Sequence, residues 1–324
     1  MRSNGEDRVN RRRFLRQSGV AAAAVLTAGR LVEAAPAGAT VAVVRDKTKK
    51  SVKGFQVDAE IVQRLVDQAV MTLSGKDDLV KAWATYVRPK DRVAIKFNGL
   101  FFRATTHGEV IHAVTKGLVK AGVDPANIVV YDRSDGDMKT SRLTINREGK
   151  GVRIYGTGRS YGKKVKAGKV GTKLSDILTR ADVLINLPMM KSHVRCGVTG
   201  ALKNHLGSVP NAGAFHENCC VAIADLNTLG PIKDKTRLCI ADALYSLYDA
   251  GPGYGGRARW DYHGILASTD PVALDATMAD IVLAKRREKG MKKLVNAPLH
   301  IARAAELGLG VADLGRIKRL AVEI

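Results

Sequence analysis

The sequence has few aromatic residues, few cysteines and no long apolar stretch, and each shortage argues against a class of function. Aromatic residues make up 5% of the 324 residues, too few for the stacked rings that bind single-stranded nucleic acid. The four cysteines do not form a ferredoxin-type run, so a four-iron cluster held by this chain alone is not expected. The apolar stretch of residues 19–29 is too short to span a bilayer. We therefore expect no nucleic-acid partner and no stable membrane span.

The first 39 residues have the order of an export signal. Arg11 and Arg12 precede Phe-Leu and a further cation, then the apolar stretch, then small residues where a peptidase can cut after Ala37 or Ala39. This order resembles a twin-arginine signal, which the Tat translocase reads as an address and which is not an anchor. We therefore expect residues 1–39 to be a signal peptide and the mature protein to be periplasmic or otherwise extracytoplasmic. A basic tail on a cytosolic protein is the alternative.

A twin-arginine signal matters because this route carries folded proteins, with any cofactor already inserted. The charge of the chain adds to this expectation. The net charge is +22, of which residues 1–39 contribute seven arginines and three acids, so about +18 remains on residues 40–324. Such an excess favours an anionic small molecule as a partner. The cations are scattered along the sequence, however, so a solvated basic surface explains them equally simply.

Residues 40–324 alternate between predicted strands and predicted helices. Strands are expected at residues 41–45, 92–97, 127–131, 181–187, 238–243, 265–268 and 319–324, and helices at residues 57–73, 110–121, 174–179, 271–285 and 298–307. Several strands are apolar throughout, which is typical of parallel strands buried on both faces. Residues 136–172 are rich in Gly, Lys and Arg without a clear period and are expected to be an insertion. We predict a single α/β domain with insertions, built on a largely parallel sheet with helices on both faces.

Polar or glycine-rich turns follow several of these strands. In open α/β sheets, ligands bind beyond the carboxyl ends of the strands. The walls of a site are therefore expected in the loops after Phe97, Tyr131, Leu187, Ala243 and Ser268.

Acidic residues provide a further candidate in the second of these loops. Asp132, Asp135 and Asp137 can bind a divalent cation or a sugar, although acids alternating in a turn are also ordinary Asx-turn chemistry. Asp275, one turn into a predicted helix, faces either the site or water.

Residues 185–220 carry the most information. A buried strand delivers Asn186, Lys191 and His193 to its carboxyl end, and a glycine-containing turn then starts a short helix with Lys203 and Asn204. Glycines before a helix let backbone N–H groups approach an anion, and Lys203 can neutralise a phosphate or carboxylate there. The segment has neither P-loop spacing nor the dinucleotide fingerprint. A phosphorylated cofactor other than NAD or a nucleoside triphosphate is therefore a candidate ligand.

Two histidine–cysteine pairs in this segment share one spacing. His193 precedes Cys196 by three residues, and His216 precedes Cys219 by three residues. Imidazole and thiolate are good ligands for zinc, iron and nickel. The four residues therefore form a candidate transition-metal site, and small packed cysteines with a chance spacing are the alternative.

The segment also carries a family resemblance. It lies between Lys96-Phe97-Asn98-Gly99 upstream and residues 264–275, Gly-Ile-Leu-Ala-Ser-Thr-Asp-Pro-Val-Ala-Leu-Asp, downstream. In this order the motifs resemble the family catalogued as domain of unknown function 362, over about residues 40–324. The resemblance implies no reaction. Many members have a ferredoxin-like extension that this chain lacks.

A more distant resemblance is to the lactate racemases, which hold a nickel-pincer nucleotide. His193 and Lys203 repeat the spacing of a histidine and a lysine in the cofactor region of that family, and His216 can stand for a further histidine. There the lysine is joined to the cofactor. The family's acidic and arginine-containing loop is represented here by residues 98–100, and its catalytic histidine by residues 132–135.

Together these observations predict an exported enzyme that depends on a cofactor or metal and performs redox or isomerase chemistry. His193 is the expected metal ligand or acid–base group, and Lys203 the anion anchor or attachment point. Lys96, Asn98, Lys191, Asn204 and His216 are expected to complete the pocket. A non-catalytic protein of the cell envelope that binds an anion or a metal is the alternative.

Overall fold

The computed structural model describes residues 38–217, 220–256 and 258–324. These residues belong to one compact unit. Residues 1–37 of the predicted export signal and Cys219 lie outside the described residues. Within the described ranges, none of the helices has the length and apolar character needed to cross a membrane.

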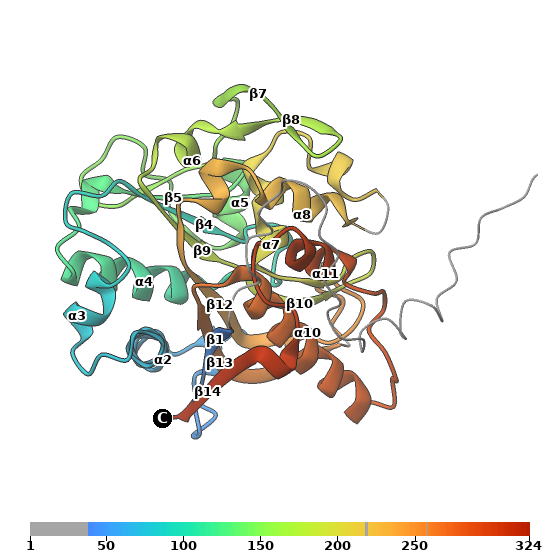
Figure 1. The fold of residues 1–324 in the computed structure, drawn as a ribbon. Helices are drawn as coiled ribbons and strands as arrows, with labels where there is room; N and C mark the ends of the chain where they lie inside the picture. Colours follow the sequence, from blue (N-terminus) through green and yellow to red (C-terminus); the bar gives the residue numbers. More distant parts are fainter. Residues whose placement is uncertain (1–37, 218–219, 257) are drawn as a thin grey trace, which may run out of the picture. The chain divides into compact units, whose positions relative to one another are not determined.

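A ten-stranded sheet forms the centre of this unit (Figure 1). Its main order is β14-β1-β13-β12-β9-β4-β5-β6, and β10 and β11 extend it beside β12. The strands are β1 Ala39–Arg45, β4 Val93–Phe97, β5 Ile128–Tyr131, β6 Arg153–Ile154, β9 Val183–Leu187, β10 Met189–His193, β11 Gly197–Thr199, β12 Thr236–Leu247, β13 Arg259–Ser268 and β14 Ile317–Glu323.

Most neighbouring strands in the sheet are parallel, as predicted. The pairs β12–β9, β9–β4, β4–β5, β5–β6 and β1–β14 run parallel. β13 runs antiparallel to both β1 and β12. The loop after Ser268 therefore lies at the opposite edge from the loops after Phe97, Tyr131 and Leu187, and its predicted place in the site wall is wrong. A run of apolar residues predicts a buried strand but not its direction, which explains the error.

Helices cover both faces of the sheet, as predicted. They are α2 Ala59–Ser74, α3 Leu79–Ala84, α4 Gly108–Lys120, α5 Asp135–Thr140, α6 Asp176–Arg180, α7 Ala201–Asn204, α8 Ala222–Asn227, α9 Gly230–Lys233, α10 Pro271–Glu288 and α11 Leu299–Glu306, with 3-10 turns η2 Pro125–Asn127, η3 His205–Ser208, η4 Ala212–Phe215 and η6 Leu314–Arg316. One buried apolar cluster joins α2, α3 and α4 to the sheet, and another joins α6, α7, α8, α10 and α11 to it. Figure 1 shows these two groups on opposite sides of the strands.

Local capping explains where the two longest helices begin. The Asp58 side chain accepts hydrogen bonds from the backbone N–H groups of Glu60 and Ile61 at the start of α2. Asp270 does the same for α10, whose first residue is Pro271. Proline suits this position because its missing N–H would have no helical partner.

Residues 136–172 have more regular structure than their composition indicates. α5 and β6 occupy part of this segment, and β7 (Tyr161–Ala167) pairs with β8 (Val170–Ser175) in a separate two-stranded sheet. The helix predicted at residues 174–179 begins two residues later, at Asp176, because Leu174 and Ser175 still belong to β8. A small hairpin of β2 (Val52–Lys53) and β3 (Gln56–Val57) precedes α2.

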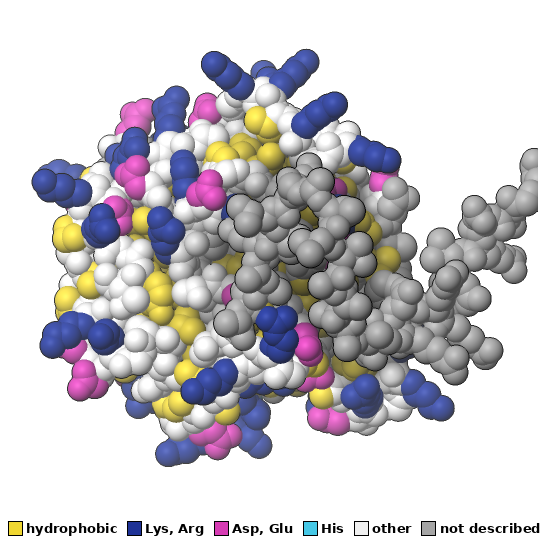
Figure 2. All heavy atoms as spheres, in the orientation of Figure 1, with side chains coloured by type: hydrophobic (Ala, Val, Ile, Leu, Met, Phe, Trp, Pro, Cys, Tyr) yellow, Lys and Arg dark blue, Asp and Glu magenta, His cyan; other side chains and the backbone are white. Residues whose placement is uncertain are grey.

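Figure 2 shows lysine and arginine side chains spread around the visible face, with acidic side chains among them. This distribution agrees with a solvated basic surface.

Candidate functional site

The carboxyl ends of β4, β5 and β9 bring a buried ion pair together. In the sheet, Lys96 lies beside Asn186 of β9 and beside Tyr131 of β5. Its Nζ atom forms a 2.8 Å ion pair with Asp132, the residue after β5. Burial lowers the pKa of Lys96 and raises the pKa of Asp132, while the contact between their charges opposes both shifts. The pair therefore has little net charge to offer a ligand.

Two asparagines connect this ion pair to α7. The Nδ2 atom of Asn204 donates to Oδ1 of Asn186 at 2.7 Å and to the carbonyl oxygen of Lys96 at 3.0 Å. The Oδ1 atom of Asn204 accepts from Nζ of Lys96 at 3.3 Å. Asn186 in turn donates to the carbonyl oxygen of Ala201 at 2.9 Å. Lys96 and Asn204, predicted to share a site, are therefore in direct contact.

Gly207 allows the chain after α7 to pack against this ion pair. A Cβ atom at this position would overlap Oδ1 of Asp132 and would lie 2.7 Å from Nζ of Lys96. Neither atom belongs to a flexible chain end, because each is held by the other and by further hydrogen bonds. Any residue other than glycine must therefore displace the pair or the 3-10 turn η3.

Lys191 provides a second buried ammonium group. It lies on β10 with 1% of its surface exposed. Its Nζ atom donates to Oδ1 of Asn98 at 3.1 Å and to the carbonyl oxygen of Ala104. Both acceptors are neutral. Burial, reinforced by the positive charge of Lys203, lowers the pKa of Lys191 to about 7.

Lys203 is the third member of this group, which we call the lysine cluster: Lys96, Lys191 and Lys203. Among the described residues, no hydrogen-bond acceptor or carboxylate contacts its Nζ atom. Burial, followed by the charge of Lys96, lowers the pKa of Lys203 to about 8. The side chain lines a pocket of about 70 Å³, whose walls include Lys96, Asn98, Asp132, Asn204 and His216. Five predicted site residues therefore share one small pocket.

His193 and His216 stack beside this pocket. Their ring centroids are 5.8 Å apart and their planes differ by 19°. Nδ1 of His193 accepts from the backbone N–H groups of Arg195 and Cys196 at 3.1 and 3.2 Å, so its proton lies on Nε2. Nδ1 of His216 lies 3.1 Å from the carbonyl oxygen of Ala212, so its proton lies on Nδ1 and Nε2 has a free lone pair. The two rings therefore offer one donor and one acceptor.

Both rings are neutral at physiological pH. Burial, followed by the charge of Lys203, lowers the pKa of His193 to about 2 and also lowers the pKa of His216. A neutral imidazole next to cations can accept a proton or bind a metal.

His300 lies close to Lys203 and His193 without lining the pocket, and the sequence analysis did not find it. It lies on α11, is fully buried, and neither of its ring nitrogens has a partner among the described residues. Burial, followed by the charge of Lys203, lowers its pKa to about 3, and His300 in turn contributes to the lowered pKa of His193. An imidazole buried without partners is costly, which is typical of a group that hydrogen bonds to a bound molecule.

A disulfide bond removes one of the ligands of the metal site predicted in this region. Ligand atoms of His193, Cys196 and His216 all lie within 4.8 Å of one another. The Cys196 sulfur, however, forms a disulfide bond with Cys220, and a disulfide sulfur is not a thiolate ligand. The hydrogen bonds to Nδ1 of His193 also occupy its only lone pair. As they stand, these residues do not fit a resident metal ion; they would do so only with the disulfide reduced and the His193 ring rearranged.

The amino end of α7 is not the open anion site that its glycines suggested. Asp275 of α10 accepts hydrogen bonds from the backbone N–H groups of Ala201 at 2.5 Å and of Leu202 at 3.0 Å. Gly200 is needed because a Cβ atom there would overlap the Asp275 carboxylate. Asp275 therefore faces neither the pocket nor water, and the predicted role of the glycine turn in anion binding is wrong.

The acids after β5 do not converge on one point. Asp132 pairs with Lys96, Asp135 forms an ion pair with Arg147, and Asp137 caps α5 through Ser134. Capping chemistry, close to the turn alternative in the sequence analysis, accounts for Asp137, whereas Asp132 and Asp135 form ion pairs.

An acid–imidazole pair, Asp242 and His107, lies outside this pocket. Nδ1 of His107 donates to Asp242 at 2.6 Å, and Asp242 also accepts from the backbone N–H group of His107. Burial opposes the charge on His107, but Asp242 outweighs burial and raises its pKa. The pair anchors the start of α4 to β12.

Comparisons with known proteins place this site in context. The family model described as Domain of unknown function (DUF362) matches residues 93–280, which include the lysine cluster, His193 and His216. None of the curated proteins matches the chain.

One solved structure that resembles this chain is a protein from Thermotoga maritima, determined as a structural genomics target. The TM-score is 0.43 and the sequence identity is 11%, and the match covers 73% of this chain and 60% of that one. Another is the lactate racemase apoprotein from Thermoanaerobacterium thermosaccharolyticum, with a TM-score of 0.44 and 9% identity over 74% of this chain and 56% of that one. The chain therefore spans less than two thirds of the length of either protein.

Proposed function

The chain belongs to the DUF362 family, and we propose that it is an enzyme that acts on or with a small anionic molecule bound at the carboxyl ends of β4, β5 and β9. The observation that carries this proposal is the state of Lys203. It lines a pocket beside two buried lysines, and no described residue neutralises it.

The charge balance of the pocket supports an anionic ligand. Asp132 neutralises Lys96, while Lys191 contacts only neutral acceptors and Lys203 contacts none. Placing the buried, uncompensated ammonium group of Lys191 next to the half-buried, uncompensated ammonium group of Lys203 is unfavourable unless an opposite charge joins them. A phosphate or carboxylate group meets this requirement. Lys203 is the proposed anchor, and its lowered pKa also makes its amine a candidate point of covalent attachment.

The histidines supply the chemistry that distinguishes an enzyme from a binding protein. The Nε2 atom of His216 has a free lone pair, His193 carries its proton on Nε2, and His300 has both nitrogens available. A neutral acceptor and a neutral donor beside a bound anion suit proton transfer of the isomerase type. A phosphorylated cofactor held by the lysines would add redox chemistry to these proton-transfer groups.

A non-catalytic protein of the cell envelope that binds the same anion is the second candidate. It requires the lysine cluster but gives no role to the three neutral histidines. The two candidates differ in the effect of His216→Gln and His300→Gln. Both substitutions should remove turnover while leaving anion binding within a few fold of wild type if the protein is an enzyme.

We further propose that the protein is exported by the Tat translocase, on the evidence of the arginine pair and the segments that follow it. Fractionation of cells that produce the full chain tests this directly. Wild type should accumulate outside the cytoplasm, and an Arg11→Lys, Arg12→Lys variant should accumulate inside it. Equal distribution of the two would contradict export by this route.

The proposed binding site is tested on protein purified from its own host. Small molecules released on denaturation are identified by mass spectrometry, and the intact protein is weighed to detect an adduct on Lys203. Wild type should carry an anionic molecule that Lys203→Ala lacks. Lys173→Ala, which removes an exposed lysine of β8, is the matched control and should retain the molecule.

A further inference from the structure

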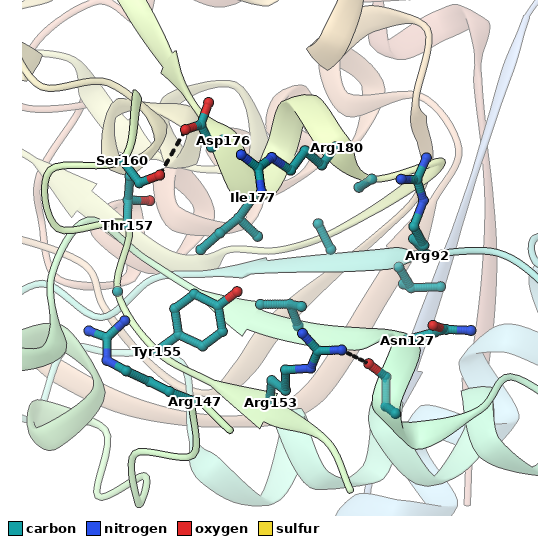
Figure 3. Close-up of a pocket in the computed structure, with 16 residues that line it drawn as sticks. Arg92, Asn127, Arg147, Arg153, Tyr155, Thr157, Ser160, Asp176, Ile177 and Arg180 are labelled. Atoms are coloured by element: carbon teal, nitrogen blue, oxygen red, sulfur yellow. Dashed lines mark hydrogen bonds between the residues drawn. The ribbon is translucent and has the colours of Figure 1, made fainter. Parts of the chain in front are cut away.

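A larger cavity lies away from the lysine cluster. Its volume is about 400 Å³, and it is bordered by the residues at the amino ends of β4 and β5, by β6 and by α6 (Figure 3). The lysine cluster lies at the carboxyl ends of the same strands. The volume is within the range of cavities that hold small molecules.

The floor of this cavity is apolar. Ala94 of β4, Val129 of β5 and Ile177 of α6 line it, and all three belong to the apolar layer on the α6 side of the sheet. The ring of Tyr155 projects among the lining residues in Figure 3. Arg147 lies over this ring, 5.1 Å from its centroid. An aromatic side chain on an apolar floor favours a flat ring as ligand.

The rim of the cavity is basic. Arg92, Arg147, Arg153 and Arg180 line it, against a single carboxylate, Asp176. Arg92 and Arg147 have carboxylate partners outside the cavity. Figure 3 shows Arg153 and Arg180 on opposite sides of the open space.

Arg153 and Arg180 have hydrogen-bond donors available to a ligand. Within the described ranges, the Arg153 side chain donates only to the carbonyl oxygen of Ala126, at 2.8 Å. Arg180 has no acceptor among the described residues. The Tyr155 hydroxyl likewise has no hydrogen-bond partner there. Guanidinium groups match the planar geometry of carboxylate and phosphate oxygens, which they can bind through two hydrogen bonds.

We propose that this cavity is a second ligand site, which binds a small molecule made of an aromatic ring and one phosphate or carboxylate group. The ring lies on the apolar floor beside Tyr155, and the anion is held by Arg153 and Arg180. The site is independent of the proposed function, because none of the lysine cluster or its histidines lines it.

The cavity binds its ligand without transforming it. Ser160 lies at its edge within a G-x-S-x-G sequence, Gly158–Gly162, that resembles a hydrolase nucleophile motif. This segment leads into the strand β7 and not into a helix, and Ser160 donates to Asp176 at 2.7 Å. No histidine lines the cavity to act as its base.

Isothermal titration of the full chain with four probes tests the proposal: phenyl phosphate, benzoate, inorganic phosphate and phenol. At least one ring-bearing anion should bind tenfold more tightly than both inorganic phosphate and phenol. The tighter of phenyl phosphate and benzoate identifies the anionic group. The double variant Arg153→Ala, Arg180→Ala should weaken that probe at least tenfold, and Tyr155→Leu should reduce its advantage over the probe without a ring.

Two control variants separate this site from general charge effects and from the lysine cluster. Arg159→Ala removes an exposed arginine in the same segment that does not line the cavity, and Lys203→Ala removes the anchor of the other site. Arg159→Ala should bind the aromatic anion as wild type does, and Lys203→Ala should retain the binding that the double variant loses. Absence of saturable binding to either ring-bearing anion would overturn the proposal. So would equal affinity in the double variant and in Arg159→Ala.

Discussion

Asp275, in the first turns of α10, accepts a 2.5 Å hydrogen bond from the backbone N–H group of Ala201, the first residue of α7. This contact joins residues 74 positions apart and is made entirely in the interior. It fills the helix start that would otherwise attract an anion, and it fixes α7 relative to the sheet. The side chain of Lys203, later in the same helix, is thereby left to face the pocket.

Removal of the Asp275 carboxylate should destabilise the protein. Asp275→Ala leaves two buried N–H groups without acceptors, at a cost of about 1–3 kcal/mol each in free energy of unfolding. Asp275→Asn keeps one acceptor and should lose about half as much. Urea unfolding followed by circular dichroism measures both values. An Asp275→Ala variant as stable as wild type would show that the contact does not contribute to the free energy of unfolding.

The same residue predicts a pH dependence of stability. Burial raises the pKa of Asp275 to about 7 from its ordinary value of 3.8. A carboxyl group whose pKa is higher in the folded state binds more protons there than in the unfolded chain. Its contribution is therefore most favourable below pH 4 and declines as pH rises from 4 to 7. The difference in unfolding free energy between wild type and Asp275→Asn should shift in that direction over this window.

Substitution of Gly207 should disrupt the pocket without replacing a charged residue. The added methyl group of Gly207→Ala overlaps Asp132 and crowds Lys96, so the ion pair or η3 must move. We expect a loss of about 1–3 kcal/mol in unfolding free energy, as for other overpacked interiors, together with loss of anion binding. Gly213→Ala is a matched control, because a Cβ atom there meets nothing within 4 Å. Equal behaviour of the two variants would contradict the packing described.

Anion binding should weaken as pH rises through neutrality. Lys191 and Lys203 have pKa values of about 7 and about 8, and a lysine is charged only below its pKa. Affinity should therefore be highest below pH 7 and fall by about tenfold or more between pH 6 and pH 9. Sulfate is a suitable titrant, since its own charge is constant over this range. Affinity that is constant or rises with pH would contradict the role of the lysines.

Metal binding should depend on the redox state of the protein. The sulfur of Cys196 would be the third ligand of a metal ion bound by His193 and His216, but it is bonded to Cys220 in a disulfide. Untreated protein dialysed against zinc should retain none at this site, and protein reduced with a phosphine should retain up to one equivalent. Cys220→Ser, which leaves Cys196 as a free thiol, should bind zinc without reduction. Zinc content that is independent of both treatments would refute this dependence.

The sequence predicted which residues of the candidate site lie near one another better than it predicted their contacts. Buried strands followed by polar turns placed Lys96, Lys191 and Asn98 at one edge of the sheet, and local spacing placed Lys203 and Asn204 beside them. Lys96 and Asn98 lie within, or one residue beyond, a strand whose hydrophobic pattern is clear, whereas Lys191 lies on β10, a strand that the sequence analysis did not predict.

Residues that enter the site from a distance could not be predicted in this way. His300 arrives next to the site on α11 through tertiary packing that leaves no local pattern in the sequence, and similar packing brings Asp275 of α10 to the start of α7. The partner of Cys196 proved to be Cys220 and not a metal, because disulfide pairing depends on the Cα–Cα distance, 5.6 Å here, and not on sequence spacing. The direction of β13 was missed for a similar reason, since it is set by the connections between strands.

The most direct test of the proposed function compares the small-molecule content of wild type and of Lys203→Ala, both purified from the native host in the folded state. Near-stoichiometric anion in wild type, absent from Lys203→Ala but retained by Lys173→Ala, is the result expected if Lys203 anchors the ligand. Retention of the same molecule by a folded Lys203→Ala protein, or its absence from wild type, would contradict the central claim.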